Sequence, residues 1–139
     1  MPYEWLPISE LDPQRGSFPA EVQFPDNSVV PVTSENISRP SWRGLLVKVV
    51  CWLWKNGHLR ESHCPIQTPR SRTRYVVHTE PVHPYSRTER GFTAHKRVGP
   101  LSVETNSNPE GIAHACRTVI EHVGQDPAQF KVWFSPPKT

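Results

Sequence analysis

Basic and aromatic side chains alternate in the middle of the chain, in a pattern that suits contact with a polyanion. Arg70, Arg72 and Arg74 are spaced two residues apart, so on a strand they would share one face. Guanidinium groups bind phosphate through paired hydrogen bonds, and exposed aromatic rings can stack on unpaired bases. We therefore expect a site for nucleic acid, either DNA or RNA, formed by Arg70, Arg72, Arg74, Tyr75, His83, Tyr85, Arg87, Arg90, Phe92, Lys96 and Arg97. The alternative is that the arginines keep a sheet edge soluble while the aromatic rings fill the core beneath a loop.

The distribution of charge also favours an anionic partner. The formal net charge of the 139-residue chain is only +3. Residues 58–99 carry eight basic and three acidic side chains, against five and six in residues 1–57 and three and four in residues 100–139. The middle segment therefore has a charge of +5, and it also holds five of the seven histidines. A local positive field of this kind suits nucleic acid, although basic loops are common on soluble proteins.

The histidines and Cys64 could also be considered as metal ligands, because zinc prefers imidazole and thiolate. His58, His63 and Cys64, with His78 or His83, would have to form such a set. Their spacing does not support it, since the chain has no C-x-x-C and no H-x-x-x-H pair. We expect no metal and no other cofactor.

No local signature of an enzyme is present. The sequence lacks G-x-S-x-G, a glycine loop that could cradle phosphate, and a motif of paired carboxylates. Glu80, Glu89 and Glu104 are interpreted as charged strand ends. A metal-dependent hydrolase or nuclease that uses His83, His95 and a carboxylate remains the less favoured alternative.

A long apolar helix is expected to organise the fold around residues 41–57. Ser41 can cap its first turn and Gly57 can close it in the left-handed conformation. An apolar stripe runs along it with helical spacing, formed by Trp42, Leu45, Leu46, Val49, Val50 and Leu53. Further apolar side chains extend round the helix, which leaves Gly44, Lys48 and Lys55 as a narrow solvated sector. The pattern is typical of a central helix that is covered on more than one side.

A second helix is predicted to start at Ser107 or Asn108, with Pro109 just inside it, and to end at Gly124. Alternating apolar residues predict strands near residues 22–24, 29–32, 74–79, 101–105 and 130–134. Residues 80–100 are expected to form a long loop. The order β-β-α-β-β-α-β predicts an α+β fold, with a small antiparallel or mixed sheet packed against two helices.

The core is predicted to contain Leu46, Val49, Leu53, Ile112, Cys116, Val119 and Ile120, in contact with the sheet residues Phe24, Val76, Val103 and Val132. Residues 1–20 are expected to be a partly disordered N-terminal arm, residues 21–134 a single domain, and residues 135–139 a tail. The three cysteines, an odd number, are expected to be reduced thiols in the cytoplasm. No apolar run approaches the roughly 20 residues of a membrane span, so we expect no membrane partner.

Three sequence phrases resemble a small domain of bacterial and phage proteins to which no activity is attached. They are S-W-R-G-L-L-V-K-V-V-C-W-L at 41–53, R-Y-V-V-H-T-E-P-V-H-P at 74–84 and L-S-V-E-T-N-S at 101–107. The resemblance covers residues 21–134, and residues 33–40 look like an insertion relative to that domain. Because the domain occurs alone or beside restriction and other defence modules, the resemblance implies a context of prokaryotic defence or nucleic-acid handling.

From these observations we expect a non-enzymatic module that binds nucleic acid or a nucleoprotein complex through residues 70–97. The main alternative is a protein-interaction subunit of a larger assembly, anchored by exposed Trp5, Trp54 or Trp133.

Overall fold

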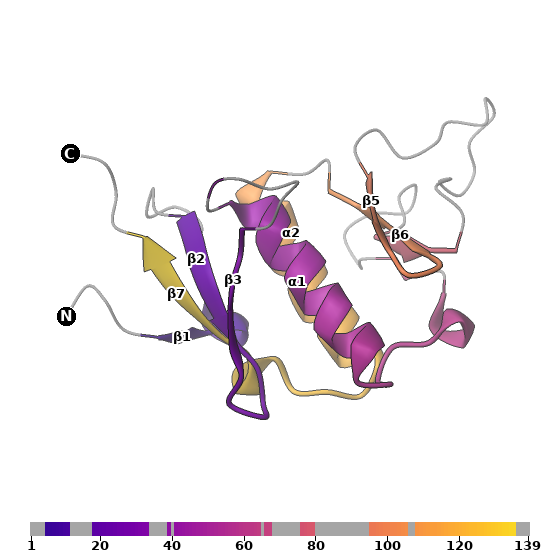
Figure 1. The fold of residues 1–139 in the computed structure, drawn as a ribbon, viewed down its shortest axis with the longest axis horizontal. Helices are drawn as coiled ribbons and strands as arrows, with labels where there is room; N and C mark the ends of the chain where they lie inside the picture. Colours follow the sequence, from indigo (N-terminus) through magenta and orange to yellow (C-terminus); the bar gives the residue numbers. More distant parts are fainter. Residues whose placement is uncertain are drawn as a thin grey trace.

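Two α-helices form the middle layer of the molecule, and a small antiparallel sheet lies on each side of them (Figure 1). The computed structural model describes residues 5–11, 18–33, 39, 41–64, 66–67, 76–79, 95–105 and 108–135. The α+β class predicted from the sequence is confirmed. The structure has two sheets where the sequence predicts one, because apolar residues cover most of the circumference of the first helix. That helix can therefore contact strands on both sides.

The first helix, α1, spans Trp42–Lys55 and has the expected end signals. The Ser41 hydroxyl accepts a hydrogen bond from the Gly44 N–H at 3.1 Å, and Gly57 follows the helix with φ of 77°. The predicted apolar stripe is buried along its whole length. Gly44 is a correction to the prediction: it is buried against Val32, because the absence of a side chain lets the strand segment approach the helix closely.

The second helix, α2, spans Pro109–His122 and packs along α1. Asn108 is its N-cap, and the side-chain oxygen accepts a hydrogen bond from the Gly111 N–H at 2.7 Å. Gly124, with φ of 80°, follows the C-terminal end as predicted. The predicted core is confirmed on both helices, and the four expected sheet-side residues belong to the same cluster.

The larger sheet has the strand order β1-β7-β2-β3, with all neighbours antiparallel. Its strands are β1 (Leu6–Pro7), β7 (Lys131–Ser135), β2 (Phe18–Gln23) and β3 (Val29–Pro31). One face packs on the helices through side chains such as Val22 and Val132, which are fully buried. Part of the segment assigned to the N-terminal arm therefore belongs to this sheet and the core. Besides β1, the short helix η1 (Ile8–Glu10) places Ile8 in the core.

The smaller sheet has the order β4-β6-β5 and consists of β4 (Val77–His78), β6 (Leu101–Glu104) and β5 (His95–Val98). β5 lies inside the stretch predicted to be a long loop. Its sequence, H-K-R-V, has too few apolar residues to reveal the alternation of a strand. β5 and β6 are joined by a tight turn in which Gly99 has φ of 56°.

Two further short helices, η3 (Glu61–His63) and η4 (Pro127–Gln129), follow the C-terminal ends of α1 and α2. None of the helices in the described part of the chain has the length and apolar character needed to cross a membrane.

Candidate nucleic-acid interface

Two of the eleven predicted site residues, Lys96 and Arg97, lie in the described part of the chain, and both are on β5. The other nine lie outside the described residues, so their placement stays a prediction: Arg70, Arg72, Arg74, Tyr75, His83, Tyr85, Arg87, Arg90 and Phe92. The description of the site therefore starts from β5 and continues with the elements that contact it.

The two cations of β5 point to opposite faces of the smaller sheet. Lys96 shares a face with Val98, which is only 6% exposed and packs toward the helices. Arg97 is exposed on the other face, where its Nη1–H donates to the Ser102 hydroxyl at 3.4 Å. Because β5 is an edge strand, its outer edge is not covered by another strand of the sheet. Lys96 and Arg97 therefore both lie on an edge strand, on opposite faces of the sheet.

Helix α1 lies next to β5, and the contact is made by Trp54 against the turn at Gly99. The indole lies so close to Gly99 that it occupies the space of a side chain at that position. Arg43 and Val47 lie on the same side of α1 as Trp54, since residues i, i+4 and i+11 of a helix point in nearly the same direction. The β5-facing side of α1 therefore carries a cation, Arg43, on its first turn and an aromatic ring on its last.

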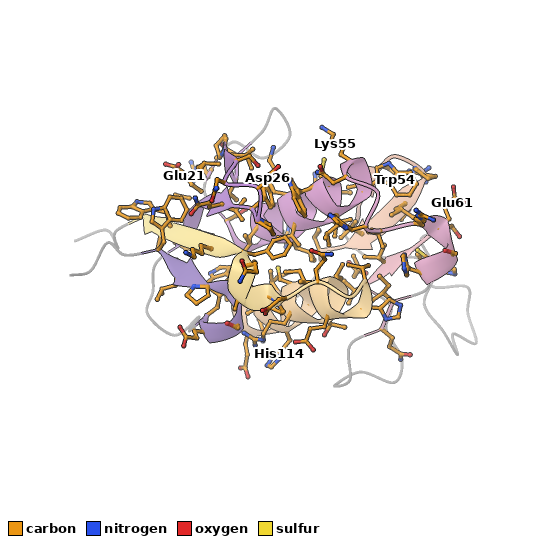
Figure 2. The ribbon with its side chains drawn as sticks, turned by 90° about the horizontal axis from the view of Figure 1, so that it is seen from below. Glu21, Asp26, Trp54, Lys55, Glu61 and His114 are labelled. Carbon is orange, nitrogen blue, oxygen red and sulfur yellow. The ribbon has the colours of Figure 1, made fainter. Side chains whose placement is uncertain are left out.

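α1 contains three charged side chains, and none of them is acidic. Arg43 and Lys55 are exposed and Lys48 is half-buried, while the 14 residues of the helix include no Asp or Glu. Figure 2 shows Trp54 and Lys55 on the same side of the molecule. Together the two elements form what we call the basic surface, defined by Arg43, Lys48, Lys55, Lys96 and Arg97. The sequence reasoning missed its α1 half, although the absence of acid from a helix with three cations was visible.

A carboxylate marks the limit of this surface on the side of the larger sheet. Asp26 lies in the turn between β2 and β3, and Figure 2 shows it beside α1 on the same side as Lys55. Hydrogen bonds from the Ser28 hydroxyl and N–H lower the pKa of Asp26, with a smaller effect from Trp52. Asp26 is therefore held as an anion at the end of the surface that lies next to the larger sheet.

The histidines near the ends of the helices make structural contacts. His58 stacks on Trp52 with ring centroids 5.3 Å apart, and its Nδ1 accepts a hydrogen bond from Gln125 Nε2 at 3.3 Å. His63 Nδ1 accepts from the Arg60 N–H at 2.9 Å, while His122 Nε2 lies 3.1 Å from the His63 carbonyl oxygen, to which it donates. These contacts attach residues 58–63 to the C-terminal end of α2. In the described ranges no three His, Cys, Asp or Glu side chains are grouped so that they could hold a metal ion.

The outward face of the smaller sheet carries polar residues that are nevertheless buried. His78 and Arg97 are the cross-strand partners of Ser102, which is fully buried, and His95 is the partner of Glu104, which is 7% exposed. The register thus places His95, a residue of the hydrolase alternative, opposite a carboxylate. His83, the other histidine of that alternative, lies outside the described residues.

Comparisons of the chain with protein-family models, with curated proteins and with solved structures found no match. What the site can bind therefore has to be inferred from its charges and contacts. The basic surface combines five cations with a half-buried indole, and these are the groups that contact phosphates and bases.

Proposed function

We propose that this protein is a non-enzymatic module that binds nucleic acid, on its own or within a nucleoprotein complex. One observation carries the proposal: the contact between Trp54 and Gly99 joins the basic strand β5 to a helix without acidic residues. Cations that are 41 to 54 residues apart in the sequence thereby lie on two neighbouring elements. The resemblance to a domain found beside defence modules supports the same class of partner.

The grouping of the cations matters more than the small net charge of the chain. A polyanion releases condensed counterions when cations neutralise its phosphates, and this release supplies most of the free energy of non-specific binding. Five cations on two neighbouring elements can contact successive phosphates of a strand that follows these elements, whereas cations spread over the whole molecule cannot do so together.

The salt dependence of binding tests the proposal. If each of the five cations neutralises one phosphate, the slope of log affinity against log salt is roughly −3.5 to −4.5. We would measure it by fluorescence anisotropy with labelled single-stranded and double-stranded DNA and RNA. The double variant Arg43→Ala/Lys55→Ala should reduce the magnitude of the slope by about two contacts, or roughly 1.4 to 1.8.

Lys131→Ala is the matched control for this measurement. It removes one exposed cation from β7, in the sheet on the opposite side of the helices. The control should keep the wild-type slope. A slope near zero for the wild type, or a loss of slope in Lys131→Ala as large as that in Arg43→Ala/Lys55→Ala, would contradict the assignment of the basic surface.

The same samples test the non-enzymatic part of the proposal. Labelled DNA and RNA incubated with the protein and Mg²⁺ should remain intact. Cleavage that is lost in Glu104→Gln would overturn it in favour of the nuclease alternative, because Glu104 lies opposite His95 in the smaller sheet.

A further inference from the structure

The outer face of the larger sheet carries several large apolar side chains although it points away from the helices. Its inward side chains, such as Val22 and Val132, are fully buried in the core. Because side chains alternate along strands, the residues beside them point outward. We define the outer face by six of these residues: Trp5, Phe18, Glu21, Val29, Lys131 and Trp133.

Aromatic side chains form the centre of this outer face. The rings of Trp5 and Trp133 have centroids 5.5 Å apart and are tilted by 54°. Phe18 and Val29 are the two large hydrophobic side chains that are recorded as exposed in the described part of the chain, at 51% and 45%. Among the described residues, the two exposed large hydrophobic side chains thus lie on one sheet face.

An antiparallel sheet with one face in the core normally carries polar side chains on its solvated face. Here both faces are rich in apolar residues, which is the pattern of a sheet that is covered on both sides. An exposed apolar patch with charged residues beside it is characteristic of a protein interaction site. The outer face therefore has the composition of a surface that a further protein layer covers.

The charges of the outer face indicate what covers it. Glu21 lies opposite Trp133 across the β2–β7 pair, and Lys131 is two residues from Trp133 on the same strand. Glu21 and Lys131 are therefore diagonal neighbours of opposite charge, and both are exposed. In the described part of the chain, the side chains of Glu21 and Lys131 form no hydrogen bond or ion pair with another residue.

We propose that this outer face binds the same face of a second copy of the chain. A two-fold axis that lies in the contact plane and passes between Glu21 and Lys131 exchanges their positions. Each Glu21 then lies opposite Lys131 of the second copy, while Trp133 lies close to its own symmetry mate. The surface is complementary to itself, because it offers one acid, one base and an aromatic centre.

The expected dimer is weak. Four short strands provide a contact smaller than a standard interface, so we expect a dissociation constant above about 10 µM. The dimer does not compete with nucleic-acid binding. Glu21 and Trp54 lie near opposite ends of the molecule in Figure 2.

Sedimentation velocity over a series of protein concentrations tests the proposal with two charge-reversal variants. The wild type should sediment faster as its concentration rises. Glu21→Lys and Lys131→Glu should each remain monomeric, because like charges then face each other across the axis. An equimolar mixture of the two variants should form a dimer again, since both charge contacts in the mixed pair join opposite charges.

Glu121→Lys is the control, because it makes the same charge change at an exposed position of α2. Alone it should dimerise like the wild type, and adding Lys131→Glu to it should not increase the amount of dimer. Circular dichroism of each variant would establish that it is folded. A wild type that stays monomeric at all concentrations would overturn self-association. The outer face would then be a candidate binding site for a different protein. A mixture of Glu21→Lys and Lys131→Glu that stays monomeric would overturn the proposed axis.

Discussion

The indole of Trp54 occupies the space that a side chain at residue 99 would need. A Cβ atom added to Gly99 would lie 2.7 Å from Trp54 Nε1 and 3.1 Å from Trp54 Cε2. This contact attaches the β5–β6 turn to the last turn of α1. It is therefore the point at which the two halves of the basic surface are held together.

Gly99→Ala should lower both the stability of the protein and its affinity for nucleic acid. The alanine would have to adopt φ of 56°, which costs about 1 kcal/mol, and its methyl group would push against the indole. We expect a total loss of roughly 2–4 kcal/mol in the free energy of unfolding. Urea denaturation would measure this loss, and fluorescence anisotropy the affinity.

Gly57→Ala separates the cost of the positive φ from the cost of the contact with Trp54. Gly57 also has a positive φ, of 77°, but no atom lies within 4 Å of the position of its Cβ. This variant should lose only the backbone contribution and keep the wild-type salt slope. If both variants lose the same free energy of unfolding, the close approach of Trp54 to Gly99 adds nothing to the cost of the substitution.

The helices could be predicted from the sequence because their signals are local. Ser41, Asn108, Gly57 and Gly124 stand where caps and terminating glycines are expected, and the apolar spacing between them identifies the buried face. The second sheet could not be predicted in the same way. β5 has one apolar residue with a described side chain, Val98, and becomes a strand through its pairing with β6.

Of the five cations of the basic surface, only the two on β5 could be predicted from the sequence. Lys96 and Arg97 were selected because they belong to the basic segment of the sequence. Arg43 and Lys55 were missed, because sequence distance gives no sign that α1 and β5 are neighbours. That proximity depends on packing between Trp54 and Gly99, which no local pattern reveals.

Gly44→Ala should destabilise the protein, although alanine is the better helix former by about 1 kcal/mol. The added Cβ would lie 2.5 Å from Val32 Cγ1 and 2.7 Å from the Val32 carbonyl oxygen. The methyl of Val32 could rotate away, but the backbone oxygen could not without moving the chain. We expect a net loss of about 1–2 kcal/mol by urea denaturation. A gain in stability would show that Val32 can move away from the new methyl group without a loss of free energy.

Leu53→Ala should cost roughly 2–5 kcal/mol, because Leu53 is completely buried between the layers. Val47→Ala is a suitable comparison, since Val47 is also on α1 but only half-buried. Its loss should be clearly smaller. Equal denaturation midpoints for Leu53→Ala and the wild type would contradict the buried face of α1.

The thiols should differ in reactivity according to their surroundings. Burial raises the pKa of Cys116 to about 12, so this thiol should resist alkylation until the protein unfolds. Burial also raises the pKa of Cys64, and the charge of Glu61 raises it further. Glu61→Gln should therefore lower the pKa of Cys64 and accelerate its reaction with iodoacetamide at pH 8, as followed by peptide mass spectrometry. The rate at Cys116 serves as the internal control, and an unchanged rate at Cys64 would rule out the effect of Glu61.

Asp26 should make stability depend on pH at acidic values. Its pKa is lowered from 3.8, because the Ser28 hydroxyl and N–H donate hydrogen bonds to Oδ1 at 2.6 and 3.0 Å. A group whose pKa is lower in the folded state stabilises that state above its unfolded pKa, and this contribution is lost as the pH falls through the folded value. Ser28→Ala removes the hydroxyl donor and should bring the pKa of Asp26 closer to 3.8, as measured by NMR titration of its carboxyl carbon. The variant should also melt at a lower temperature than the wild type at pH 7, while this difference should disappear once Asp26 is protonated in both proteins. A difference in melting temperature that persists unchanged at low pH would assign the effect of Ser28 to the geometry of the turn and not to the charge of Asp26.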